Sequence, residues 1–229
     1  CMARRGAGEG SNPCRIVTPR LRTSVSLGSS LLYTVYHLTS AGDEGGNGEN
    51  NEKGDGPLEE LHFADACEEE HFSAMSLIHA LGWRTTYPGA VPAGYLEREI
   101  TDDRWVSCFR EDHASGRRHG LLLYRGDTPV SCATYGPARM GADLREGSLV
   151  SFHSAGYEGW GEIVSFYTHP EEKGKGYGGL LMEEILRRMK AEGFPSCFVF
   201  VLRENQGTRR VYARHGFSWD GNQADIPFP

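Results

Sequence analysis

The fold is decided by residues 162–182, which read EIVSFYTHPEEKGKGYGGLLM. Residues 161–168 are rich in β-branched and aromatic side chains and predict a strand. This strand ends before Pro170, because proline has no N–H group for a ladder. The apolar residues after the glycines recur at helical spacing and predict an amphipathic helix that ends at Gly193.

The loop between them, residues 173–179, has the chemistry of an anion site. Free backbone N–H groups and the helix dipole favour an anion there, and the glycines let the backbone approach a phosphate closely. Lys173 and Lys175 add positive charge. The spacing is not that of a nucleoside-triphosphate loop or a dinucleotide fingerprint. A phosphate cradle and a flexible turn before a helix both remain open from these residues alone.

Upstream of this stretch the pattern predicts a strand, helices and a hairpin. Asp65 is expected to cap the first helix, because three acids follow it and apolar residues continue at helical spacing to about Leu81. The other predicted elements are a strand at 58–63, a helix at 93–100, a helix that begins at Thr101, and a hairpin of 119–124 with 129–135.

Downstream the pattern predicts a buried strand at 198–202, a helix at 206–215 and a strand that starts at Phe217. Residues 220–222 are expected to form a turn into a short last strand at 224–228. The order of elements predicts a mixed α/β domain with helices on both faces of one central sheet.

Composition bounds the class of protein. The chain has 229 residues, 38% of them hydrophobic, which suits one folded domain with or without an extension. No stretch approaches the ~18 apolar residues of a membrane helix, and a net charge of -7 argues against nucleic acid as a partner. The six cysteines form no CxxC pair, which predicts reduced thiols in the cytoplasm and no metal.

The first 57 residues differ from the rest. Residues 41–56, AGDEGGNGENNEKGDG, are too polar to bury a core and predict a flexible linker or a long loop. Residues 1–40 are rich in arginine and serine and fit a transit peptide, a disordered tail, a remnant of a neighbouring domain or a stretch not native to the protein. Residues 31–38 have the composition of a strand. We therefore expect residues 1–57 to be a poorly ordered extension and linker and residues 58–229 to be the folded domain.

Several blocks of the sequence resemble one family. Lys173-x-x-Gly176-x-Gly178 is similar to the acyl-CoA-binding motif of the GNAT superfamily of N-acetyltransferases, with lysine in place of the usual arginine or glutamine. The resemblance spans about residues 58–220 and is closest to small bacterial members. Its other blocks are the segment Asn205-x-x-Thr208-x-x-x-Tyr212-x-x-x-Gly216-Phe217, residues 82–92, and the end of the hairpin at 133–139.

The resemblance implies a single mixed, mostly antiparallel central sheet, and an enzyme that transfers an acetyl group from acetyl-CoA to a primary amine. The acceptor would be a small molecule or a peptide and would attack directly in a ternary complex. Two alternatives stay open, a protein acetyltransferase and a non-catalytic acyl-CoA sensor. Acetyl-CoA is the expected cosubstrate and no metal is expected. The expected assembly is a monomer or a homodimer in the cytoplasm, with no membrane partner.

The same resemblance implies the cofactor site. Backbone groups of three strand residues would pair with the pantetheine arm, and the loop N–H groups would hold the pyrophosphate. Asn205 would bind the pantetheine or cap the helix that starts at Gln206. The implied cofactor-binding residues are Phe166, Tyr167, Thr168, Lys173, Gly174, Lys175, Gly176, Tyr177, Gly178, Gly179 and Asn205.

Two residues are candidates for catalysis. Tyr212 would protonate the leaving thiolate, or would be a packed aromatic residue of its helix. Glu162 would be the general base, or a strand-edge acid or member of an ion pair. Trp83 and Tyr87 would line the acceptor site, or pack in the core. Because relatives have a full final hairpin, the short C-terminus implies an acceptor site that is open or completed by another subunit.

Overall fold

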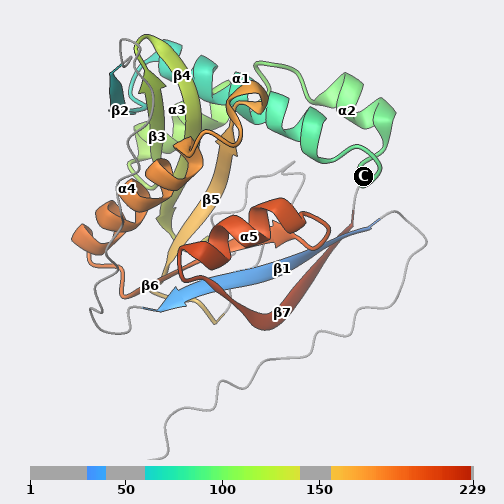
Figure 1. Ribbon diagram of the computed structural model, residues 1–229, viewed down its shortest axis with the longest axis vertical. Helices are drawn as coiled ribbons and strands as arrows, with labels where there is room; N and C mark the ends of the chain where they lie inside the picture. Colours follow the sequence, from blue (N-terminus) through green and yellow to red (C-terminus); the bar gives the residue numbers. More distant parts are fainter. Residues whose placement is uncertain (1–29, 40–59, 140–155, 228–229) are drawn as a thin grey trace, which may run out of the picture.

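The computed structural model describes residues 30–39, 60–139 and 156–227. Within these ranges, seven strands form one sheet in the order β2-β3-β4-β5-β6-β1-β7 (Figure 1). Every neighbouring pair is antiparallel except β5 and β6, which are parallel. The predicted mixed, mostly antiparallel sheet is confirmed. The strands are β1 Ser30–Thr39, β2 Leu61–Asp65, β3 His119–Arg125, β4 Thr128–Pro137, β5 Gly161–Thr168, β6 Ser196–Leu202 and β7 Ser218–Pro227.

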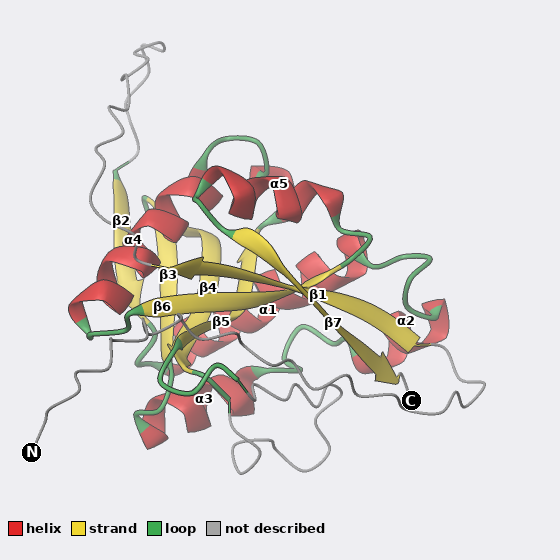
Figure 2. Cartoon of the chain, turned by 90° about the horizontal axis from the view of Figure 1, so that it is seen from below, coloured by secondary structure: helices red, strands yellow, loops and turns green. Residues whose placement is uncertain are grey.

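Helices cover both faces of the sheet. The helices are α1 Glu69–Thr86, α2 Ala93–Glu99, α3 Val106–Ser115, α4 Tyr177–Ala191 and α5 Gln206–Arg214. On β3, Leu121 and Leu123 pack in the cluster that contains α4, whereas Leu122 between them packs against α1 and α3. Because side chains alternate along a strand, α4 and α5 share one face of the sheet, and α1 to α3 share the other. Figure 2 shows α4 and α5 on the opposite side of the strands from α3.

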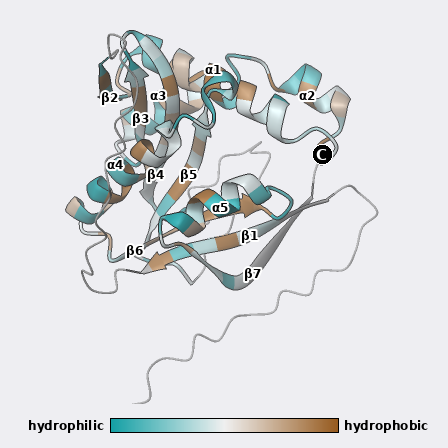
Figure 3. Ribbon diagram, viewed as in Figure 1, coloured by the Kyte–Doolittle hydropathy of each residue, from teal (hydrophilic) through white to brown (hydrophobic). Residues whose placement is uncertain are grey.

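The amphipathic pattern of α4 is confirmed. Its buried side chains are spaced along one stripe, and its outer side chains are mostly polar, with Leu180 as an exposed apolar exception. Figure 3 shows hydrophobic residues on strands such as β5 and β6 and hydrophilic residues on the outer turns of α4. The stripe consists of Leu181, Met182, Ile185 and Met189.

Strand β1 is the largest departure from the predicted domain division. It lies between β6 and β7 and pairs with both, so that Tyr33 is opposite Leu202 and Leu31 is opposite Ile226. The boundary expected at residue 58 leaves this strand outside the domain, whereas the sheet includes it. The strand-like composition of residues 31–38 was the signal for it. The remainder of the expected extension lies outside the described residues, at 1–29 and 40–57.

The predicted C-terminal hairpin is wrong. Residues 218–227 form one strand, and the expected turn at 220–222 is a bulge opposite Val35 of β1. Gly221 has a φ of 89°, a conformation that favours glycine and explains why the segment looks like a turn. In the sheet, β1 lies between β6 and β7.

Two predictions about α1 also need correction. Glu68, not Asp65, stands at the N-cap, and Asp65 ends β2 and forms an ion pair with Arg188 of α4. The helix continues past Leu81 to Thr86, because Trp83 on its last turns is buried in the core. Across the described segments, none of the helices combines the length and the apolar character needed to cross a membrane.

Candidate active site

The site begins where two parallel strands separate. β5 and β6 pair only from Gly161 opposite Cys197 to Ile163 opposite Val199, near the start of each strand. Beyond these pairs the strands diverge, and a cavity of about 680 Å³ opens between residues 164–168 and 199–202. Among the described residues, no strand lies beside the peptide groups of β5 that face this gap, so an extended ligand can pair with them as an added strand does.

The glycine-rich loop closes one end of the gap. Gly174 and Gly176 have φ values of 84° and 89°, and Gly176 is the N-cap of α4. The first N–H groups of a helix have no acceptor within that helix, so those of Tyr177 and Gly178 are available to an anion, whereas the Gly179 N–H donates to the Gly176 carbonyl at 2.9 Å. Gly178 lies so close to β5 that an added Cβ would be 3.3 Å from the Thr168 hydroxyl. The loop therefore approaches β5 closely and lines one end of the cavity.

The two lysines of the loop differ. Lys173 lines the cavity. The Lys175 ammonium lies 2.9 Å from the Glu172 carboxylate and holds the pKa of that carboxyl below its ordinary value. Glu172 also pairs with Arg125 at 3.3 Å. Lys175 is outside the cavity lining and anchors the loop, so among the expected cofactor residues its side chain is the one that the geometry places elsewhere.

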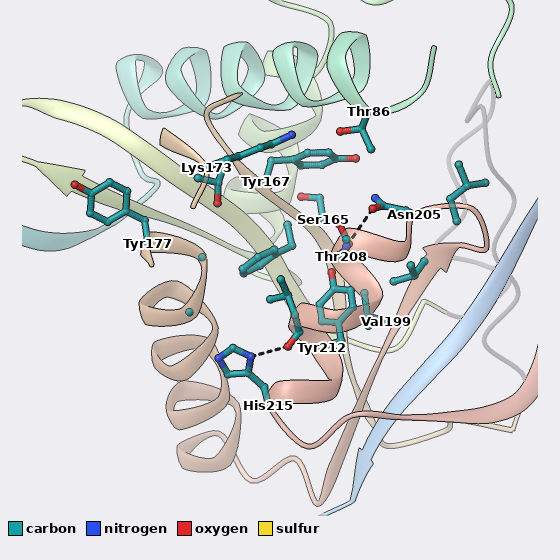
Figure 4. Close-up of a pocket in the computed structure, with 18 of the residues that line it drawn as sticks. Thr86, Ser165, Tyr167, Lys173, Tyr177, Val199, Asn205, Thr208, Tyr212 and His215 are labelled. Carbon is teal, nitrogen blue, oxygen red and sulfur yellow. Dashed lines mark hydrogen bonds between the residues drawn. The ribbon is translucent and has the colours of Figure 1, made fainter. Parts of the chain in front are cut away.

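Helix α5 supplies the opposite wall. The Asn205 side chain accepts a hydrogen bond from the Thr208 N–H at 3.1 Å, and Asn205 also lines the cavity. The cap uses the amide oxygen, which leaves the amide NH₂ as a donor. Both predicted roles of Asn205 therefore fit the geometry. Figure 4 shows Asn205, Thr208 and Tyr212 gathered on the side of the pocket opposite Tyr177.

Tyr212 is buried in the wall between α5 and β5. Its ring lies 6.2 Å from that of Phe166, centroid to centroid, and its side chain lines the cavity. Burial raises the pKa of the Tyr212 phenol, and the neighbouring Tyr87 raises it further. The phenol therefore keeps its proton at neutral pH. Tyr212 is therefore a packed aromatic residue that also lines the cavity.

Glu162 lies outside the cavity. Its carboxylate is fully buried and accepts hydrogen bonds from Arg139, at 2.9 Å from the backbone N–H and 2.8 Å from Nε. The cavity lining begins at Val164, two positions further along β5. Of the alternatives left open for Glu162, the ion pair describes its contacts, and a base that reaches a substrate does not.

The α1 side of the gap is aromatic. Tyr87 at the end of α1 lines the cavity together with Tyr167 of β5, whereas Trp83 is buried in the core beside them. Tyr167 fits against α1 because position 82 is glycine, where an added Cβ would lie 2.3 Å from the Tyr167 ring. For Trp83, core packing is the alternative that its position favours.

Several lining residues were not predicted. Thr208, Val211, Arg214 and His215 share a face of α5 and its C-terminal end with Asn205 and Tyr212. Helical spacing from Asn205 and Tyr212 was the signal that would have found them. The Nδ1 atom of His215 is 2.9 Å from the Val211 carbonyl, which leaves Nε2 directed elsewhere. Across the described ranges, no group of three or more His, Cys, Asp or Glu residues is placed to hold a metal ion.

The chain matches the model of the acetyltransferase (GNAT) family over residues 76–217. This match includes β5, the glycine-rich loop and α5. The chain therefore belongs to the acetyltransferase (GNAT) family.

Relatives agree with this assignment. A mycothiol acetyltransferase of Streptomyces avermitilis is 32% identical over 121 residues, which cover 51% of this chain and 39% of the relative. The Bacillus subtilis protein named uncharacterized N-acetyltransferase YuaI is 24% identical over 141 residues, which cover 59% of this chain and 69% of the relative. The chain thus spans about two fifths of the mycothiol acetyltransferases that it matches.

Solved structures show the same fold. The PaiA N-acetyltransferase of Thermoplasma acidophilum, solved with coenzyme A, has a TM-score of 0.54 at 17% identity and covers 73% of this chain and 97% of its own. A GCN5-related N-acetyltransferase of Ralstonia eutropha has a TM-score of 0.52 at 16% identity, with 71% and 95% covered. The single sheet with helices on both faces is therefore the fold of this family.

Proposed function

We propose that the protein is an N-acetyltransferase that moves the acetyl group of acetyl-CoA to a primary amine of a small molecule or a peptide. The observation that carries this proposal is the position of the cavity. It begins at a glycine-rich loop with a helix N-terminus, follows unpaired strand edges, and reaches a protonated phenol. Family membership supports the reaction class.

The loop and β5 have the groups to hold the donor. N–H groups around Gly174, Gly176 and Gly178 suit the pyrophosphate, with Lys173 as the neighbouring cation. Peptide groups of Phe166 and Thr168 suit the amides of the pantetheine arm, whereas the Tyr167 carbonyl accepts a hydrogen bond from the Ser131 hydroxyl of β4 at 2.8 Å. The Asn205 amide NH₂ faces the same gap and adds a donor.

The chemistry needs little more than these groups. The neutral amine attacks the thioester carbonyl, a C–N bond forms, and the C–S bond breaks. In this scheme a strand N–H near Phe166 stabilises the oxyanion, and the Tyr212 hydroxyl gives its proton to the departing thiolate. The proton of the amine passes to water, which regenerates the phenol. The products are the N-acetyl amide and free CoA thiol.

Glu162 has no part in this scheme. Its ion pair with Arg139 occupies its carboxylate, and residues 164–168 separate it along β5 from the loop. Relatives named mycothiol acetyltransferase match over 39% of their length, so the proposal names an amine class and not their acceptor.

A direct test measures release of CoA thiol from acetyl-CoA against a library of amines, with Tyr212→Phe beside the natural chain. Acetylated product with stoichiometric thiol is expected. Tight binding of acetyl-CoA without turnover on any amine would favour the alternative of a non-catalytic sensor and would overturn the proposal.

A further inference from the structure

The gap between β5 and β6 passes through the sheet and has two unlike faces. On β5, Phe166 packs with Tyr212 on the α4–α5 face, and Tyr167 packs with His79 and Trp105 around α1. The loop, α4 and α5 lie on the first face, so the donor enters there. A second substrate that meets the thioester from across the sheet arrives on the α1–α2 face.

Three phenols from three different elements converge on this second face. Tyr87 of α1 and Tyr167 of β5 line the cavity, and Tyr33 of β1 packs behind them against Leu202. Burial raises the pKa of Tyr167 well above its ordinary value, and the nearby Tyr87 and Tyr33 hydroxyls raise it further. Tyr33 and Tyr87 belong to one buried cluster, and Tyr167 packs against it. We call Tyr33, Tyr87 and Tyr167 the tyrosine wall, and Tyr212 lines the same cavity as Tyr87 and Tyr167.

The tyrosine wall carries no charged side chain. The charged or imidazole residues that line the cavity are Glu172, Lys173, Arg214 and His215, and all of them belong to the loop or to the α5 end. On the α1 side of the described lining, the residues are Thr85, Thr86, Tyr87, Ser165, Tyr167, Phe200 and Leu202, and none of these side chains is charged.

The ionisable side chains of α1 and of the segment after α2 that lie near the tyrosine wall have other partners or are neutral. Arg84 of α1 pairs with Asp102 at 2.5 Å, and Arg104 lies against Tyr95 of α2. His79 of α1 is stacked between Trp105 and Tyr167, and burial keeps it neutral. Burial of an ammonium group beside such a wall would leave it without a carboxylate partner in the described part of the chain, which is costly.

We propose that Tyr87 and Tyr167 bind the acceptor, and that they select a primary amine that is less basic than an alkyl amine and belongs to a molecule with an aromatic or similarly apolar ring. The inference rests on the proposed acetyl transfer and specifies its acceptor. Offset stacking on the phenol rings would hold the ring of the acceptor, and the hydroxyl groups would orient its amine. Tyr33 is a positioning residue that supports Tyr87, which makes β1 part of the acceptor site.

Three amines test separately whether the acceptor needs a ring and whether it needs a weakly basic amine. Phenylalanine amide has a ring and an α-amine of pKa ~7.7–8.0, glycine amide has a similar amine without a ring, and 2-phenylethylamine has a ring with an alkyl amine whose pKa is closer to the ~10.4 of lysine. At pH 7 we expect kcat/KM for phenylalanine amide to exceed the other two by at least about 10-fold. We also expect it to bind the enzyme–CoA complex at least about 10-fold tighter than glycine amide, as measured by calorimetry.

Variants test the wall itself. Tyr87→Leu is expected to raise KM for phenylalanine amide about 10-fold and to abolish its advantage over glycine amide, with KM for acetyl-CoA changed less than about 2-fold. Tyr33→Leu should raise the same KM about 3-fold or more with kcat retained, and Tyr33→Phe should rescue it.

Tyr124→Phe on β3, outside the cavity lining, is the matched control and should change neither constant. If the leucine variants are unstable, Tyr87→Phe and Tyr167→Phe still test whether the hydroxyl groups matter.

The outcomes distinguish this inference from the proposed function. Turnover that is equal for glycine amide and phenylalanine amide would overturn the inference and leave acetyl transfer standing. Preferred binding of a trimethylated, permanently cationic analogue would also overturn it, because an aromatic wall that selects cations binds by cation–π attraction. Selective binding of phenylalanine amide without any acetylation would support the wall and overturn the proposed function.

Discussion

The His79 imidazole stacks on the Trp105 indole, with ring centroids 4.0 Å apart and an angle of 5° between the planes. Tyr167 covers the other side of the imidazole at 4.2 Å. Burial lowers the pKa of His79 to about 3, so the ring is neutral when the protein is folded. This stack links the core of α1 to the tyrosine wall of the cavity, and it has a consequence for stability at low pH.

The unfolded chain protonates this histidine near its ordinary pKa of ~6.5, whereas the folded protein does not until about pH 3. The unfolded state therefore binds more protons between these values, and stability falls as the pH falls through that window. The contribution approaches ~1.4 kcal/mol per pH unit. His79→Phe keeps the stack and should flatten this slope in urea titrations from pH 7 to pH 4. The exposed His113→Gln serves as the control, and an equal slope in the His79→Phe protein would contradict the assignment.

Gly176→Glu should abolish binding of acetyl-CoA. The side chain would add a negative charge at the N-terminus of α4, on a residue with a φ of 89°. Gly193 at the other end of α4 has a φ of 87°, so Gly193→Glu introduces similar backbone strain away from the cavity. Calorimetry should detect no binding to the first variant and near-normal binding to the second. Equal affinity in the two variants would refute the anion site.

Tyr212→Phe should lower kcat by ~10- to 10³-fold with little change in affinity for acetyl-CoA, because it removes a proton donor and keeps the ring. The ring contacts with Phe166 and Phe217 are retained, so stability should change little. Tyr157→Phe, which loses a hydrogen bond to Asp220 outside the cavity lining, is a phenol-for-ring control. Steady-state kinetics with the concentrations of both substrates varied measure kcat and KM for acetyl-CoA. A normal kcat would mean that water protonates the thiolate.

Glu162→Gln should affect stability and leave the pH dependence of the rate unchanged. Removal of one charge from a buried ion pair costs ~3 kcal/mol or more. The partner is Arg139, whose side chain is 13% exposed beside the fully buried Glu162. Urea unfolding measures the loss of stability. The pH–rate profile, recorded under conditions in which the variant is still folded, measures the pH dependence of the rate. A shifted profile would restore Glu162 as a candidate base.

The sequence predicts those features of the molecule whose residues are close together in the chain, and it does not predict those that depend on residues far apart in the chain. Strand β5, the loop and α4 are adjacent in the chain, and their periodicity and glycines predict them closely. Whether Glu162 faces a substrate or an arginine depends on a contact with residue 139, which no local pattern encodes. The same holds for Asp65, whose partner is Arg188.

The position of β1 shows the same limit on a larger scale. The composition of residues 31–38 indicates a strand, but only the assembled sheet shows that it lies between β6 and β7. The bulge at 220–222 resembles a turn in sequence, because Asp, Gly and Asn occur in both. The contribution of Tyr33 to the tyrosine wall follows from this strand order and could not be predicted without it.

Gly82 is the most direct test of how the helix and the strand fit together at the site. An added Cβ there would lie 2.3 Å from Cδ1 of Tyr167, so the Tyr167 ring must move. Alanine otherwise favours a helix over glycine by ~1 kcal/mol, so local propensity predicts that Gly82→Ala stabilises α1. We expect the opposite, a loss of ~1–3 kcal/mol, because overpacking of a core is destabilising.

Gly94→Ala on α2 meets only the flexible end of Arg98 at 3.0 Å and is the matched helical control. Urea unfolding of both variants, with tyrosine and tryptophan fluorescence as the reporter, should separate them. A Gly82→Ala protein as stable as Gly94→Ala would mean that Tyr167 has room to move and that the tyrosine wall is not rigid.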